Sequence, residues 1–84
     1  MIYVANIYVT LKSTVNDPQG NTIVQGLKSL GFAEVQDVRM GKYLTIRLEA
    51  LNGDEASARV DEMCSRLLAN PVIESYRFDV DVVK

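Results

Sequence analysis

The residues Asn16–Gly20 mark the point where the chain changes from the pattern of a strand to that of a helix. Before them, the side chains of Ile2–Lys12 alternate between two faces, which is typical of a β-strand. Asp17 suits the N-cap of a helix, and Pro18 suits the first helical position, where a backbone N–H is not needed. Apolar residues then return at helical spacing, at Ile23, Val24, Leu27 and Leu30. The sequence therefore predicts a strand, a sharp turn and a helix in this order.

This first helix is expected over residues 18–30, with Gly31 as the residue that ends it in a left-handed conformation. Its N-terminus presents bare N–H groups that could hold an anion. Capping by Asp17 alone explains the residues found there, so we favour a capped helix without a ligand.

The two faces of the first strand differ in polarity. The odd-numbered face is the more apolar and is predicted to lie against the helices: Tyr3, Ala5, Ile7, Val9 and Leu11. The even-numbered face still carries Ile2, Val4 and Tyr8, which is more apolar surface than a small monomer exposes. Closed symmetric pairing is the commonest way to bury such a face, so we expect a dimer or tetramer.

A second strand is expected at Phe32–Met40, although the odd separation of Val35 and Val38 interrupts its alternation. Met40-Gly41 would then form a tight turn into a third strand at Lys42–Leu51. The third strand alternates well, with Leu44, Ile46, Leu48 and Ala50 directed inward.

A second helix is expected between a turn at Asn52–Asp54 and the stop at Asn70-Pro71, followed by a last strand from Tyr76 to Val83. The order strand, helix, strand, strand, helix, strand in one domain over residues 1–84 predicts an α+β fold. The expected architecture is a ferredoxin-like βαββαβ two-layer sandwich, with two helices on one face of a four-stranded antiparallel sheet.

This topology has a consequence for function, because it gathers three loops at one end of the sandwich. They are Asp17–Gly20, Arg39–Lys42 and Asn70–Val72. Turns need glycine and proline, but the charges of Arg39, Lys42 and Glu74 are interpreted as not required by any turn.

Composition excludes several classes of function. The net charge of −2 argues against a nucleic-acid-binding protein, which would carry a basic patch. Tyr8 and Tyr43 could stack on RNA bases, but packing of a half-apolar sheet against another subunit is the simpler use. We expect no membrane association and a cytoplasmic location, because no apolar run is long enough to span a bilayer and the one cysteine suits a reducing compartment.

Catalytic chemistry has few candidates. The sequence has no histidine, so the commonest general base and metal ligand is missing. Cys64 lies on the apolar stripe of the second helix and is expected to be buried and inert. Asp79 and Asp81 share a strand face and could hold a hard cation, but more ligands would be required. We therefore predict no catalytic, cofactor-binding or metal-binding residue in this chain.

Three stretches together resemble the PurS family, the small subunit of phosphoribosylformylglycinamidine synthase in purine biosynthesis. The first contains Leu11-Lys12, Val15 and Asp17–Gly20, and the second contains Leu30–Phe32 and Val38–Lys42. The third extends from Met63-Cys64 through Leu67–Glu74 to Tyr76. The resemblance covers nearly the whole chain in order.

The resemblance implies a non-catalytic subunit of a ligase that uses ATP, Mg and glutamine, none of them bound by this chain. It implies a homodimer or homotetramer that joins the synthetase subunit to the glutaminase subunit and supports ammonia transfer. The family signatures fall on the three gathered loops. The residues proposed to dock partners are Asp17, Gln19, Arg39, Lys42, Asn70 and Glu74.

Two other classes of function stay open at this stage. Ferredoxin-like domains often pair as small-molecule-binding regulatory modules, which would require a ligand pocket at a dimer interface. A stand-alone enzyme that uses the sheet face is disfavoured, because no histidine or activated nucleophile is present. Fold alone does not decide among these classes.

Overall fold

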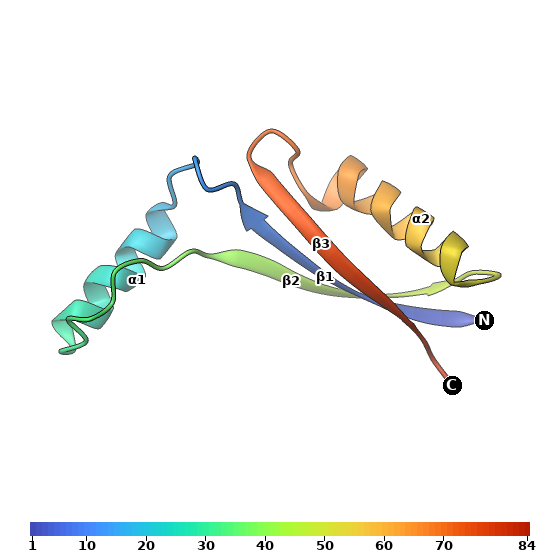
Figure 1. Ribbon diagram of the computed structural model, residues 1–84, viewed down its shortest axis with the longest axis horizontal. Coiled ribbons are helices and arrows are strands. Elements are labelled where there is room, and N and C mark those ends of the chain that lie inside the picture. The colour runs from blue at the N-terminus through green and yellow to red at the C-terminus, as the bar shows by residue number, and fades with distance from the viewer.

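The computed structural model describes all residues, 1–84, and contains one antiparallel sheet with two helical segments (Figure 1). Its elements, in chain order, are β1 (Ile2–Leu11), α1 (Pro18–Ser29), β2 (Gly41–Glu49), α2 (Gly53–Met63), the π-helical turn η1 (Cys64–Leu68) and β3 (Glu74–Val82). Both predicted helices and three of the four predicted strands are therefore present.

The sheet has the strand order β2-β1-β3, with both pairs antiparallel. Val9 of β1 lies opposite Lys42 on one side and Tyr76 on the other, which fixes the register. β1 is the central strand, so its side chains are the most buried of the sheet.

The predicted second strand at Phe32–Met40, which would have made the sheet four-stranded, does not form, so this prediction is wrong. This segment has no strand pairing, and the predicted hairpin at Met40-Gly41 does not form. The segment instead returns from the far end of α1 to the start of β2 (Figure 1). The interrupted alternation at Val35 and Val38 agrees with this, because a strand with no consistent apolar face has nothing to hold its register.

The core lies between one face of the sheet and α2. Ala5, Ile7 and Val9 pack there against Val60, Cys64 and Ala69. A smaller cluster of Tyr3, Ala50 and Ala56 extends it toward the start of β1. The predicted direction of the odd-numbered face of β1 and the burial of Cys64 are both confirmed.

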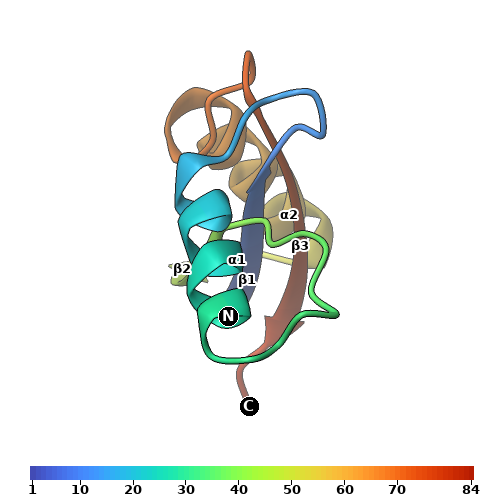
Figure 2. The same ribbon diagram turned by 90° about the vertical axis from the view of Figure 1, so that its left-hand side faces the viewer.

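The prediction that both helices lie on one face of the sheet is wrong. α2 covers the sheet, whereas α1 projects beyond its end and gives the molecule an elongated shape of 51 × 29 × 14 Å (Figure 1). Figure 2 looks along this long axis, with α1 in front and the sheet behind. Gly20 is the only fully buried residue of α1, and its apolar stripe is only partly covered within the chain, with Val24 and Leu27 half-buried and Ile23 exposed.

The ends of α1 follow the sequence closely. Asp17 is the N-cap and Pro18 the first helical residue. At the other end, Gly31 has a φ of 102°, and the Phe32 N–H donates to the Leu27 carbonyl at 3.0 Å. This is the glycine-dependent C-terminal motif that the sequence predicts.

Candidate partner-docking site

The three loops predicted to gather do meet at one end of the sheet. We call this region the loop end and define it as residues 12–20, 38–42 and 68–74. The Arg39 guanidinium donates to the Lys12 carbonyl at 2.8 Å, and the Lys12 ammonium donates to the Pro71 carbonyl at 2.8 Å. These two bonds link the segments that follow β1, precede β2 and precede β3.

Asp17 is the buried polar residue of the loop end, with an exposed fraction of 3%. Its carboxylate accepts from the Gly20 N–H at 2.9 Å and from the Met40 N–H at 2.6 Å. These two bonds hold the pKa of Asp17 below its usual range, with the positive charge of Arg39 contributing less. Asp17 therefore caps α1 and also ties it to the segment that enters β2.

Gly20 is required by the same arrangement. A Cβ atom at this position would collide with the Val38 carbonyl oxygen. The close approach of Val38 to the first turn of α1 places Met40 within reach of Asp17. The predicted capping by Asp17 is confirmed, because its side chain accepts from the Gly20 N–H at this N-terminus.

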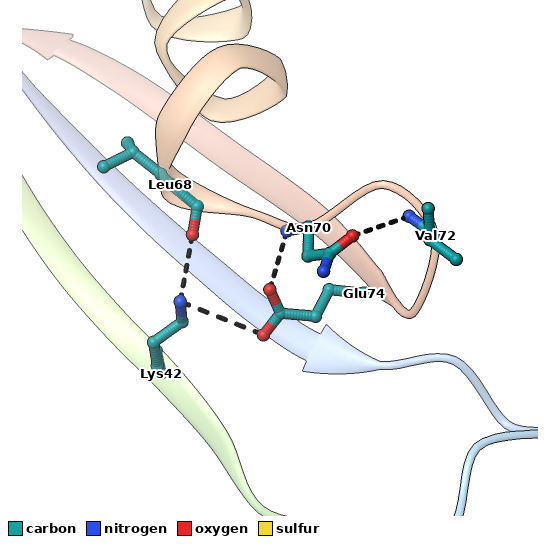
Figure 3. Close-up of polar contacts among 5 residues, drawn as sticks. All are labelled: Lys42, Leu68, Asn70, Val72 and Glu74. Carbon is teal, nitrogen blue, oxygen red and sulfur yellow. Dashed lines mark hydrogen bonds and ion pairs between the residues drawn. The ribbon is translucent and has the colours of Figure 1, made fainter.

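Lys42, Asn70 and Glu74 form one connected set of polar contacts (Figure 3). The Lys42 ammonium donates to the Leu68 carbonyl at 3.0 Å and lies 3.8 Å from Glu74 Oε2. Glu74 Oε1 accepts from the Asn70 N–H at 2.7 Å. Asn70 Oδ1 in turn accepts from the Val72 N–H at 3.0 Å. The charges and the amide together fix the conformation of the loop between η1 and β3.

These contacts correct the interpretation that the charges of Lys42 and Glu74 are not required by any turn. The Glu74 side chain is only 18% exposed and holds the turn at Asn70, so its charge does serve a turn. Lys42 likewise binds the carbonyl that ends η1. Both residues have a structural use that spacing alone did not indicate.

Gln19 lies beside a surface hollow of about 260 Å³ between the start of α1 and the strand ends. The hollow is lined by Leu11, Asp17, Gln19, Met40, Gly41, Lys42 and Glu74. Four of the six predicted docking residues thus face one hollow, while Arg39 and Asn70 lie elsewhere on the loop end. Lys12 was not predicted, although its place at the end of β1 put it at the same end of the sheet.

The other groups considered from the sequence are buried or already in contact with side chains of this chain. Burial raises the pKa of the Cys64 thiol, as does the nearby charge of Asp61, so the thiol stays protonated at neutral pH. On the outer sheet face, Asp79 accepts from the Asn6 amide at 3.0 Å. The Tyr8 ring lies 5.0 Å from the Tyr43 ring, and the Arg77 guanidinium lies 4.0 Å from the centre of the Tyr8 ring.

None of the helices has the length and apolar character needed to cross a membrane.

Comparison with protein families matches residues 4–82 to the PurS family, described as phosphoribosylformylglycinamidine (FGAM) synthase. The phosphoribosylformylglycinamidine synthase subunit PurS of Bacillus subtilis (strain 168) is 46% identical over 82 residues, which are 98% of this chain and 96% of that protein. The PurS subunit of Methanocaldococcus jannaschii is 39% identical over 83 residues, which are 99% of this chain and 100% of that protein.

The chain is also similar to solved PurS structures. Thermus thermophilus PurS in the P21 form superposes with a TM-score of 0.88 at 38% identity, covering 100% of both chains. A chain of PurLQS from Thermotoga maritima superposes with a TM-score of 0.88 at 33% identity, covering 96% of this chain and 99% of that chain. The similarity extends over nearly the whole sequence and over the detached position of α1. The chain therefore belongs to the PurS family of phosphoribosylformylglycinamidine synthase.

Proposed function

We propose that this chain is the small, non-catalytic subunit of phosphoribosylformylglycinamidine synthase. The observation that carries the proposal is the full-length similarity to PurS chains, one of them from the structure named PurLQS. The occupied polar groups of the loop end support a structural role rather than a catalytic one. The ATP, Mg and glutamine of the reaction are bound by the other subunits, in the cytoplasm.

The proposed role is to join the synthetase subunit to the glutaminase subunit and to support ammonia transfer between them. The loop end is the proposed contact surface, because its loops are held rigidly by the Asp17 and Glu74 carboxylates. A surface that is already ordered loses little conformational entropy on docking.

Sedimentation of the purified subunits tests this role. The chain mixed with the synthetase and glutaminase subunits should form one complex containing all three, in the presence of glutamine, ATP and Mg. A synthetase–glutaminase complex that assembles equally well without the chain would contradict the proposed role.

The proposed oligomer is a homodimer in which each copy covers the α1 helix of the other. An isolated helix of 12 residues is marginal in water, and α1 has exposed apolar side chains, among them Ile23. On the covered face of the sheet, α2 contacts β1 and β3, so Ile46 of β2 stays only half-buried. The α1 helix of a second copy fits this place, and exchange of an element between identical copies is a low-cost route to a dimer.

The outer sheet face is the second surface available for association, and its use would convert dimers to a tetramer. Ile2 is exposed there and Val4 is half-buried. Tyr8 contributes less than the sequence suggested, because its ring already packs between Tyr43 and Arg77.

A further inference from the structure

Lys12 and Arg39 are two cations of the loop end that have no carboxylate partner. The ion pairs of the chain are Lys42–Glu74, Arg59–Glu62 and Arg66–Glu62. Lys12 and Arg39 instead donate to backbone carbonyls, which are neutral acceptors. Neither cation forms an ion pair, and the charge of Arg39 interacts only with the buried carboxylate of Asp17.

Both cationic side chains are held in place by hydrogen bonds to the backbone of the loop end. The Arg39 side chain bonds to the Lys12 carbonyl at 2.8 Å, and the Lys12 side chain bonds to the Pro71 carbonyl at 2.8 Å. Ordering two long cationic side chains costs conformational entropy. A partner of opposite charge would offset this cost.

The carboxylates of the loop end are already bonded to other groups. Asp17 is buried and bonded to two backbone N–H groups, and Glu74 is paired with Lys42. The preceding segment carries Glu34 and Asp37, but neither forms an ion pair with Arg39. The local surface is thus cationic, although the whole chain has a net charge of −2.

Two apolar side chains lie beside these cations. Val72 is 77% exposed and Ile73 is 39% exposed. The Lys12 N–H donates to the Ile73 carbonyl at 2.8 Å, which places this pair next to Lys12. The turn uses only the backbone N–H of Val72, so the apolar side chain at this position has no use within the chain.

We propose that Lys12, Arg39, Val72 and Ile73 form a docking patch for an acidic segment of another subunit of the assembly. The segment would place carboxylates on the two cations and apolar side chains on Val72 and Ile73. Charge complementarity of this kind fixes orientation and speeds association. The inference rests on the proposed function and names the part of the loop end that is free to bind.

The test measures binding of the full-length chain to the purified synthetase–glutaminase pair by biolayer interferometry, at low and at physiological salt. The charge-neutral variant Lys12→Gln with Arg39→Gln should bind about tenfold or more weakly, because a charge pair is lost at the interface. It should also show a smaller loss of affinity on addition of salt than the unmodified chain. Val72→Ser should weaken binding without changing the salt dependence.

Lys84→Gln is the matched control, since Lys84 is an exposed cation without an ion pair and follows the end of β3 that lies opposite the loop end. It should bind normally, and circular dichroism should show that every variant is folded. Unchanged affinity of both loop-end variants would overturn the patch alone, as would a loss confined to Lys84→Gln. Absence of binding by the unmodified chain would overturn the proposed function itself.

Discussion

Asp17 joins two segments that are far apart in the sequence, and its carboxylate does so in the ionised form. The Gly20 and Met40 N–H groups lower its pKa from the ordinary value of 3.8. A carboxylate with a depressed pKa stabilises the folded state above the unfolded pKa, and this contribution is lost as the pH falls through the folded pKa. Asp17 therefore links the stability of the loop end to pH.

We predict that Asp17→Asn lowers the Tm at pH 7 by about 4–8 °C, because the amide can still cap α1 but its NH2 group cannot accept from the Met40 N–H, so one buried hydrogen bond is lost. The Tm difference between variant and unmodified chain should shrink as the pH falls below about 4, because Asp17 of the unfolded chain then takes up a proton while the folded carboxylate, whose pKa is lower, is still ionised. Calorimetry at pH 7 and pH 3 measures both values. An equal difference at the two pH values would show that the charge of Asp17 is not what stabilises the cap.

Gly20 gives a second prediction at this scale. Gly20→Ala should lower the Tm by more than Asp17→Asn does, because the added Cβ collides with the Val38 carbonyl and must separate α1 from the segment entering β2. Gly53→Ala is the matched control, since open space surrounds the same atom at the start of α2. Comparable thermal unfolding of the two variants would contradict the close approach at Gly20.

At the scale of elements, α1 is the feature that the sequence described correctly and placed wrongly. Capping by Asp17, Pro18 at the first position and Gly31 after the end are local signals, and they fixed its bounds to within one residue. Its position depends on which surface covers its apolar stripe. A covering surface on a second copy, as proposed above, leaves no local signal in the sequence, which therefore predicts that the stripe packs on this chain's own sheet.

The failed strand at Phe32–Met40 follows from the same cause. If α1 lay on the sheet, the chain would return as a strand beside it. Because α1 projects away, these residues are needed to cover the distance back to Gly41. The odd separation of Val35 and Val38 was the sequence feature that argued against a strand here.

At the loop end, topology predicted the gathering of the loops. The hydrogen bonds of individual side chains, such as that of Glu74 with the Asn70 N–H, depend on rotamers that spacing does not determine.

The exposed stripe of α1 yields a prediction about association. Ile23→Asp should convert the proposed dimer to monomer at micromolar concentration, because it places a charge on the face that the second copy is proposed to cover. Gln25→Asp, on the polar side of the same helix, should leave the dimer intact. Light scattering after size-exclusion chromatography gives the mass of each. A dimeric Ile23→Asp variant would exclude α1 as the exchanged element.

At the scale of the whole molecule, two surfaces of the chain are proposed to bind other chains. The sheet and α2 form a core in which Cys64 and the inward side chains of β1 are buried. From this core, α1 projects on one side and the loop end lies where α1 departs (Figure 1). The proposed association surface and the proposed docking surface thus meet at Asp17, so a substitution in one is expected to affect the other.

The rate of the reconstituted enzyme tests the central claim most directly. The synthetase and glutaminase subunits are assayed with and without this chain, once with glutamine and once with ammonia as the nitrogen source. The account predicts no turnover by the chain alone, a large increase in the glutamine-dependent rate on its addition, and a smaller effect on the ammonia-dependent rate. A full glutamine-dependent rate in its absence would contradict the account.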